Sequence, residues 1–232
     1  MKKLLTTALL VILSFTIFGQ VEIGSSTDFT EVETDGTIEF HGDATVWDDY
    51  VVPFAAVKIK KEIDAPIWEV FIGDEGDGIY QYNFEESKLE EVGMTIQLPH
   101  SWNGTAIHPH IHWSPEDNTS GTVVWYMEYS WVNYNSTTQY VFPDAVRLTA
   151  TASVANDSHK HLIAGFGSIT PETSGANPQN AVSSILMIRF YRDPKETTSG
   201  ALNDTYNSGA FALSFDIHFE KNTVGSRQEY IK

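Results

Sequence analysis

Alternation of apolar and polar residues with a period of two constrains this chain more than any other feature. Side chains two residues apart share one face of a β-strand, so each alternating run predicts a strand with one buried face. The clearest run separates five apolar residues by small or polar ones: Phe211, Leu213, Phe215, Ile217 and Phe219. We predict that these five residues form one face directed into the core.

Three further runs support the same interpretation. Residues 94–98 and 123–131 alternate in the same way, whereas residues 182–192 are apolar on both faces and are expected at the centre of a sheet. Polar turns join these runs, and the helical crossovers that parallel strands require are missing. We therefore predict an all-β fold of roughly eight to ten strands, an antiparallel two-sheet β-sandwich that is jelly-roll-like.

The first residues read as a secretory signal peptide rather than as part of the fold. Lys2 and Lys3 precede an apolar stretch that ends at Phe18, and Gly19 is a small residue at the expected cleavage site. The stretch is shorter than the about 20 apolar residues of a membrane span. We predict export to the periplasm, the outer surface or the extracellular space, with no membrane span after cleavage. The predicted divisions are a signal peptide at 1–19, a polar N-terminal arm or edge strand at 20–42, a β-sandwich domain at 43–222 and a C-terminal arm at 223–232.

Charge and cysteine content restrict the partners and the chemistry. The chain has 31 acidic and 14 basic side chains, a net charge of −17 and no cysteine. A surface this acidic repels phosphate backbones, so nucleic acid is not an expected partner. Without cysteine, disulfides and thiolate metal sites are excluded, and histidine and carboxylate remain as metal ligands.

The strongest candidate site is a run of alternating histidines. His108, His110 and His112 are expected on one strand face, with Ile111 and Trp113 on the opposite, buried face. Imidazoles two residues apart on a strand can hold a divalent metal ion, but the outer pair starts about 13 Å apart, so all three do not share one ion easily. The alternative is a polar outer face or a subunit interface, in which Asp216, His218 and Glu220 of another strand pair with the histidines.

A spaced set of glycine, histidine and glutamate residues surrounds this strand, and a histidine and an asparagine follow near the end of the chain: Gly104, His110, His112, Glu116 and Gly121, then His218 and Asn222. The first five resemble the first motif of the cupins, and the last two resemble the end of the second. The likeness implies a metal-dependent enzyme that uses His110, His112, Glu116 and His218. Two features depart from the family: the lead of the second motif is missing before His218, and an inward face at 211–219 would turn His218 outward.

Two loops supply further candidates. Asp74, Glu75 and Asp77 lie in one glycine-rich loop that could hold Ca²⁺, the alternative being an acidic hairpin turn. His100 and Trp102 share a short loop, and we expect Trp102 to be exposed and to contact a ligand such as a glycan. Four other tryptophans lie among apolar neighbours and are expected in the core: Trp68, Trp113, Trp125 and Trp131.

Six short strings occur together along the chain, at 44–53, 97–100, 107–113, 128–131, 189–194 and 222–227. They include the His-Pro-His-Ile-His-Trp strand and the C-terminal Thr-Val-Gly-Ser-Arg segment. Taken together, they resemble a group of uncharacterised phage-type structural or tail-associated proteins. The likeness implies a noncatalytic β-sandwich that acts as a homo-oligomer or with other structural proteins. Phage virion proteins do not normally need a signal peptide, which indicates an exported relative.

These observations lead to one main hypothesis and two alternatives. The main hypothesis is an exported, noncatalytic β-sandwich protein with a structural or binding role, related to phage structural proteins. The alternatives are a cupin-like metal-dependent enzyme and an extracellular carbohydrate-binding module. No residue is assigned a catalytic role, and a divalent metal is the one cofactor that the sequence suggests.

Overall fold

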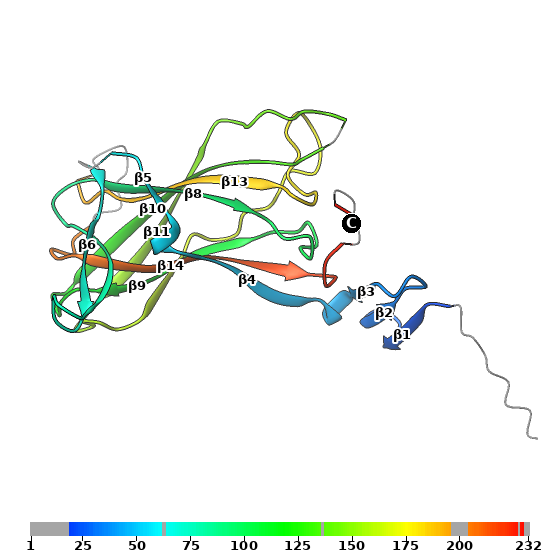
Figure 1. Cartoon of the computed structure of the whole chain (residues 1–232), viewed down its shortest axis with the longest axis horizontal. Helices are drawn as coiled ribbons and strands as arrows, with labels where there is room; N and C mark the ends of the chain where they lie inside the picture. Colours follow the sequence, from blue (N-terminus) through cyan, green and yellow to red (C-terminus); the bar gives the residue numbers. More distant parts are fainter. Residues whose placement is uncertain (1–18, 62–63, 136, 196–203, 227, 230–232) are drawn as a thin grey trace, which may run out of the picture.

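Strands make up almost all the regular structure of the chain, and two antiparallel sheets pack as a sandwich (Figure 1). This arrangement confirms the predicted fold. No helix among the described residues is long and apolar enough to cross a membrane. The predicted signal peptide lies outside these residues except for Gly19. The computed structural model describes residues 19–61, 64–135, 137–195, 204–226 and 228–229.

One sheet has five strands, in the order β11-β10-β13-β8-β5. β13 lies at its centre, as the two apolar faces of residues 182–192 predicted. The four longer strands bury alternate residues against the other sheet, whereas β5 is a two-residue strand at the edge. The strands are β5 (Lys58–Ile59), β8 (Glu90–Gln97), β10 (Gly121–Val132), β11 (Val146–Val154) and β13 (Ile185–Arg192).

The other sheet has six strands, and β14 is its central element. The order is β12-β9-β14-β7-β6, and the later part of β14 also pairs with β4. β9 therefore lies between β12 and β14, with its outer face open to solvent. The strands are β4 (Val46–Pro53), β6 (Ile67–Ile72), β7 (Ile79–Phe84), β9 (His108–Pro115), β12 (Leu162–Gly165) and β14 (Ala210–Lys221).

The segment predicted as an arm or edge strand forms a small sheet of its own beside the sandwich (Figure 1). Its strands are β1 (Val21–Gly24), β2 (Phe29–Val32) and β3 (Ile38–His41). The backbone N–H of Phe40 donates to the carbonyl of Asn222, which connects this sheet to the end of β14. Two 3₁₀ turns follow, η1 (Gly42–Ala44) and η2 (Phe54–Ala56).

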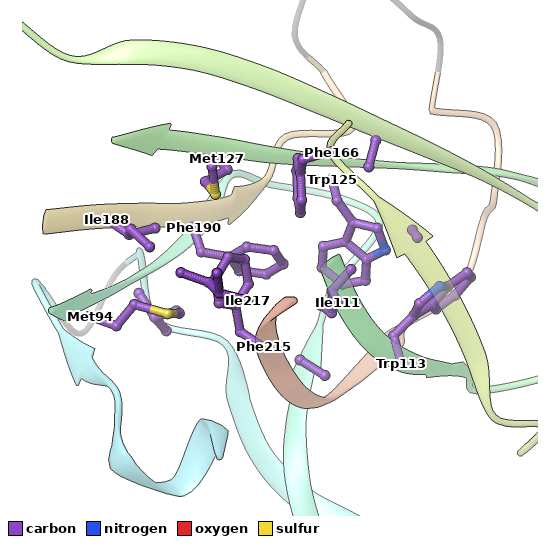
Figure 2. Close-up of a cluster of buried hydrophobic side chains, with 14 of the residues drawn as sticks. Met94, Ile111, Trp113, Trp125, Met127, Phe166, Ile188, Phe190, Phe215 and Ile217 are labelled. Carbon is purple, nitrogen blue, oxygen red and sulfur yellow. The ribbon is translucent and has the colours of Figure 1, made fainter. Parts of the chain in front are cut away.

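Aromatic side chains from both sheets fill the core (Figure 2). Trp125 of β10 stacks on Phe190 of β13 with centroids 5.2 Å apart, and Phe190 meets Phe215 of β14 at 6.0 Å. Trp113 and Trp131 are also fully buried, as predicted. Each large side chain removed from water contributes about 1.5–3 kcal/mol, so this cluster holds the two sheets together. Trp68 differs from the prediction because 46% of its surface is exposed, at the sheet edge.

A β-bulge divides β14 and corrects the predicted face of Phe211. The pairing of β14 with β9 shifts by one residue between Ala212 and Ser214. Such a shift exchanges the two faces of a strand. Phe215 and the later apolar residues therefore point into the sandwich core, whereas Phe211 packs against Phe71 on the opposite face, with ring centroids 5.0 Å apart. The bulge also sets which polar residues of β14 lie beside the β9 histidines.

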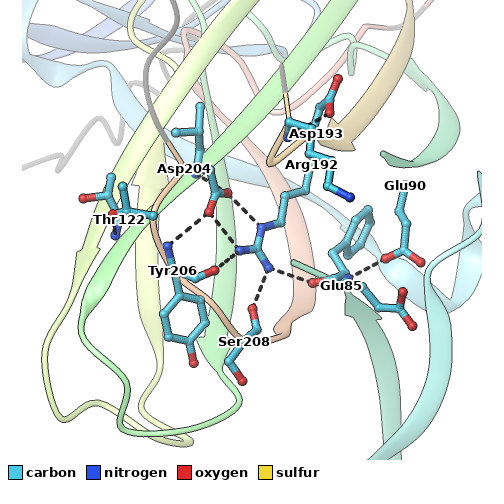
Figure 3. Close-up of polar contacts among 12 residues, drawn as sticks. Glu85, Glu90, Thr122, Arg192, Asp193, Asp204, Tyr206 and Ser208 are labelled. Carbon is cyan, nitrogen blue, oxygen red and sulfur yellow. Dashed lines mark hydrogen bonds and ion pairs between the residues drawn. The ribbon is translucent and has the colours of Figure 1, made fainter. Parts of the chain in front are cut away.

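A buried arginine fastens the segment before β14 to the sandwich (Figure 3). Arg192 is fully buried and uses all five N–H donors. Two go to the Asp204 carboxylate, both at 2.9 Å. The other three go to the carbonyls of Tyr206 at 2.7 Å, Phe84 at 2.9 Å and Ser208 at 2.8 Å. This network fixes residues 204–208 against the end of β7.

Candidate functional site

The alternating histidines lie on the outer face of β9, as predicted. His108, His110 and His112 are partly buried there, whereas Ile111 and Trp113 on the other face are fully buried. The neighbouring strand β14 presents polar residues on the same outer face. Its Asp216 pairs with His110 and its His218 pairs with His108, which confirms the expected cross-strand pairing for these two residues. Glu220 differs from the expectation: it pairs with Trp47 of β4, and its carboxylate accepts hydrogen bonds from Thr45 and Asn103.

Two of the histidines and one carboxylate converge. The Nε2 atoms of His110 and His112 are 3.1 Å apart, and the His112 Nε2 lies 3.1 Å from Oδ2 of Asp216. The His110 Nε2 lies 3.9 Å from the same oxygen. We call these three residues the His110–His112–Asp216 cluster. His108 does not share it, as the strand spacing predicted.

Further contacts orient both imidazoles of the cluster. Nδ1 of His110 lies 3.2 Å from the backbone carbonyl oxygen of His108. Nδ1 of His112 lies 2.6 Å from Nε2 of His161, which directly precedes β12. Burial lowers the pKa of His112 below its usual range, and the nearby His110 and His161 add to this, although Asp216 opposes it. Neutral imidazole is thus the favoured form of His112 near pH 7.

Trp47 of β4 lies beside the cluster and is half exposed. Its indole stacks on the His218 ring, with centroids 4.8 Å apart and planes 5° apart. The edge of His108 approaches the same indole at 5.3 Å. His218 Nδ1 also lies 2.8 Å from the Asp49 carboxylate, so the ring position is fixed from two sides.

These groups border a hollow of about 710 Å³, which we call the Trp47 hollow. Gly165 and Gly167 lie at its β12 side, and a Cβ added at either position would meet no atom within 4 Å. The side of the hollow is open at these glycines because they lack side chains. Its polar and aromatic lining includes Trp47, Asp49, His108, His110, His112 and His218.

The structure does not assemble the cupin-like set. Glu116 lies at the end of β9, where its carboxylate accepts hydrogen bonds from the backbone N–H of Gly209 at 2.8 Å and from Ser208 Oγ at 3.0 Å. His218 contacts Asp49 instead of joining His110 and His112. Glu116 thus supports the loop before β14, and the carboxylate that lies beside the two histidines is that of Asp216.

The predicted ligand contacts at His100 and Trp102 are corrected as well. Trp102 is only 3% exposed, and its ring packs 5.6 Å from that of Trp131. The His100 imidazole contacts the hydroxyls of Ser183 and Ser226, so it joins loops rather than facing a hollow. The loop before β9 folds back over the end of the sandwich core, and sequence spacing alone could not reveal this.

The acidic residues of the predicted calcium loop do not gather. Asp74, Glu75 and Asp77 lie exposed in the turn between β6 and β7, where the Asp74 carbonyl accepts the N–H of Gly78 at 2.7 Å. Among the described residues, convergent metal-type ligands occur in two clusters, and neither includes this loop. One is the His110–His112–Asp216 cluster, and the other comprises Glu31, Glu39 and His41 of the N-terminal sheet.

The sequence interpretation missed three members of the site. His161 lies 49 residues from His112 along the chain, and only the pairing of β12 with β9 brings it near. Asp216 was expected beside the histidines but not as a ligand. Trp47 directly precedes Asp48 and Asp49 on β4, and no pattern in the sequence marked its indole as exposed.

A larger hollow, of about 1020 Å³, is lined by residues of the five-stranded sheet and by residues 50–53 of β4. Its central cation, Arg189, is already paired with Glu91 and with Glu128. Two carboxylates thus satisfy Arg189, whereas Oδ1 of Asp216 in the His110–His112–Asp216 cluster is buried without a hydrogen-bond partner. We therefore take the Trp47 hollow as the candidate functional site.

Comparison with known proteins does not identify the site. No protein family model and no curated protein matches the sequence. Similar solved structures include the CBM22-1–GH10 modules of endo-1,4-β-D-xylanase 10B from Clostridium thermocellum, complexed with xylohexaose, at 13% identity and a TM-score of 0.37. That match covers 79% of this chain and only 30% of the xylanase chain.

A second similar structure is TmCBM61 in complex with β-1,4-galactotriose, at 13% identity and a TM-score of 0.29. The match covers 74% of this chain and 86% of that one. Neither likeness is strong enough to say what this chain binds.

Proposed function

We propose that this protein is a noncatalytic binding protein and that the Trp47 hollow takes a saccharide. The observation that carries the proposal is the Trp47 indole, which is 49% exposed and borders a hollow lined with polar side chains. An indole offers a flat apolar surface for the C–H face of a sugar ring. Polar groups around such a surface fix the orientation of the ligand.

The groups beside Trp47 suit sugar hydroxyls. The Asp49 carboxylate accepts hydrogen bonds, and imidazoles donate or accept according to their tautomer. The His218 ring supports the indole from one side and is itself held by Asp49. This support keeps the platform in place before a ligand arrives, which lowers the entropy lost on binding.

Charge narrows the class of saccharide. The net charge of −17 disfavours acidic polysaccharides, because like charges repel. The predicted export would also place the protein where neutral glycans occur. A neutral mono- or oligosaccharide is therefore the ligand class that we propose.

Glycan-array binding followed by titration calorimetry tests this proposal. Trp47→Ala should weaken saccharide binding at least tenfold, because the stacking surface is lost. Trp68→Ala is the matched control, since Trp68 is similarly exposed but does not line the hollow. Unchanged binding by Trp47→Ala, or an array on which the wild-type protein binds no glycan, would contradict the proposal. Turnover of a bound saccharide would contradict its noncatalytic part.

A structural role in an assembly is the second candidate, and exposed apolar residues favour it. Ile67, Trp68, Ile72 and Ile79 are 41–59% exposed on β6 and β7, and β6 is an edge strand of its sheet. An edge strand with apolar side chains can pair with the same strand of a second copy. We expect light scattering to detect an oligomer that Ile72→Lys with Ile79→Lys converts to a monomer. A monomeric wild-type protein would contradict this role.

A further inference from the structure

We propose that Nε2 of His110, Nε2 of His112 and a carboxylate oxygen of Asp216 bind a divalent transition-metal ion of the zinc type. The three atoms are separated by 3.1, 3.1 and 3.9 Å. Two ligands at about 2.0–2.1 Å from a tetrahedral Zn²⁺ ion lie about 3.3 Å apart. The observed separations are close to this value, so small side-chain movements suffice to place an ion between the three atoms.

The tautomer of His110 supports the assignment. Its Nδ1 lies 3.2 Å from the carbonyl oxygen of His108, and a carbonyl oxygen can only accept a hydrogen bond. Nδ1 therefore carries the proton, and in the neutral ring Nε2 presents a lone pair to the cluster. Metal-binding histidines characteristically donate their second ring N–H to such a neighbour.

Nδ1 of His112, the ring nitrogen outside the cluster, also has a hydrogen-bond partner. It lies 2.6 Å from Nε2 of His161, so one of these two nitrogens donates to the other. If Nδ1 of His112 donates, its Nε2 also presents a lone pair, and a metal ion satisfies all three ligands. If His161 donates instead, Nε2 of His112 carries a proton and the cluster is a hydrogen-bonded network without an ion. These two arrangements define the opposing outcomes of the experiment.

Asp216 provides an independent observation. Its side chain is 9% exposed, and its Oδ1 atom is buried without a hydrogen-bond partner. Desolvating a carboxylate is costly unless hydrogen bonds or a cation compensate. In the described structure the other oxygen faces only the two imidazoles. A divalent cation would compensate both the buried charge and the converging lone pairs.

The backbone holds the ligands in fixed positions. His110 and Asp216 are direct partners on neighbouring antiparallel strands, and His112 follows two residues along β9. The bulge between Ala212 and Ser214 sets this register. Three protein ligands leave a coordination position open, and both histidines line the Trp47 hollow. The site is thus open to water or to a ligand, and it does not depend on the Trp47 indole that carries the saccharide proposal.

Zinc titration of the metal-stripped full-length protein, followed by calorimetry and by competition with a chromophoric chelator, tests the assignment. We expect one high-affinity Zn²⁺ per chain. His110→Ala, His112→Ala and Asp216→Asn should each weaken binding about 100-fold or more, and His161→Ala about 10-fold. Calcium and magnesium should not compete, because they prefer oxygen ligands.

Three matched variants separate this site from adventitious zinc on exposed histidines. Two of them are His108→Ala and His218→Ala, because these histidines lie on the same outer face but outside the cluster. The third is His41→Ala, which removes the histidine of the N-terminal cluster. All three should bind Zn²⁺ as the wild type does. The assignment is overturned if wild-type protein lacks a high-affinity site, if His112→Ala binds normally, or if a control variant loses as much affinity as His112→Ala.

A spectroscopic measurement keeps the proposal testable if a variant folds poorly. Long-range ¹H–¹⁵N correlation spectra of the wild-type imidazoles report which ring nitrogen carries a proton. On addition of Zn²⁺, the Nε2 signals of His110 and His112 should shift while their Nδ1 atoms stay protonated. Spectra that keep a proton on Nε2 of His112 at saturating Zn²⁺ would show the ion-free network instead.

Discussion

Two buried carboxylates in this protein have opposite surroundings. Asp204 is 1% exposed and binds Arg192, whose five N–H donors all find acceptors within 2.9 Å. Asp216 is 9% exposed and faces two imidazole nitrogens, and its Oδ1 lacks a partner. The first network closes on itself between the sheets. The second lies on an outer face and borders a hollow.

The difference distinguishes a polar network that stabilises the fold from a polar cluster that can bind a ligand. A buried network in which every donor meets an acceptor has no capacity left for a ligand, and removing one member leaves an uncompensated charge. A cluster with spare acceptors is less favourable for the empty protein but gains when a cation arrives. This comparison yields four predictions about stability, from the largest effect to the smallest.

Asp204→Asn should cause the largest loss of stability. The Arg192 guanidinium would stay buried without its counter-charge, and breaking a buried pair in this way costs about 3–5 kcal/mol. Chemical denaturation should show this decrease in the free energy of unfolding. Lys221→Ala is a suitable control, because its ion pair with Asp48 is partly exposed and should matter less. A loss under about 1 kcal/mol would show that the Asp204 network is not structural.

Zinc should stabilise the wild-type protein next most strongly. An ion that binds only the folded state adds about 2.7 kcal/mol at a free concentration of about 100 times its dissociation constant. The unfolding midpoint should therefore rise with added Zn²⁺. His112→Ala should show no such rise, while His108→Ala should behave as the wild type does.

Glu90, next to the Arg192 network, should make the stability of the protein depend on pH (Figure 3). Burial raises its pKa to about 7 from 4.5, although the Glu85 N–H and Lys88 oppose this. Between these values the folded state holds the proton more tightly than the unfolded state. The contribution of Glu90 to the free energy of unfolding should thus fall as pH rises from about 4.5 to about 7 and stay constant above. The two pKa values correspond to about 3 kcal/mol, which solvent screening reduces to about 2 kcal/mol.

Glu90→Gln tests this directly, because the amide is neutral at every pH and can still accept the Glu85 N–H. Denaturation at several pH values should show a flatter profile for the variant, which should be the more stable protein at pH 8. Parallel profiles for the two proteins would indicate that Glu90 titrates normally in the fold.

Asp216→Asn should give the smallest change in the free energy of unfolding of the metal-free protein, under about 1 kcal/mol in either direction. The substitution removes a buried charge that has few partners, so little stabilisation is lost. It is the matched counterpart of Asp204→Asn. Similar losses for the two variants in metal-free denaturation would refute the distinction between a closed network and a binding cluster.

The sequence predicted the parts of this molecule that depend on local pattern. Alternation identified β9, β10 and the central strand β13, and it placed His108, His110 and His112 on an outer face. It failed at Phe211, because one extra residue in a bulge exchanges the faces of β14 without any change in the pattern. It failed at Trp102, because the path of a loop depends on what the loop covers.

The sequence by itself determined the fold class, the aromatic core and the direction of the β9 histidines, since these depend on a period of two along a strand. Only the tertiary structure decided which polar groups meet. The bulge set Asp216 beside His110, the pairing of β12 brought His161 to His112, and β4 placed Trp47 at the rim of the hollow. The partners that meet across strands lie 49 to 171 residues apart in the sequence. The reason is that the pairing register between neighbouring strands brings these side chains together, and the spacing of residues along a single strand does not reveal that register.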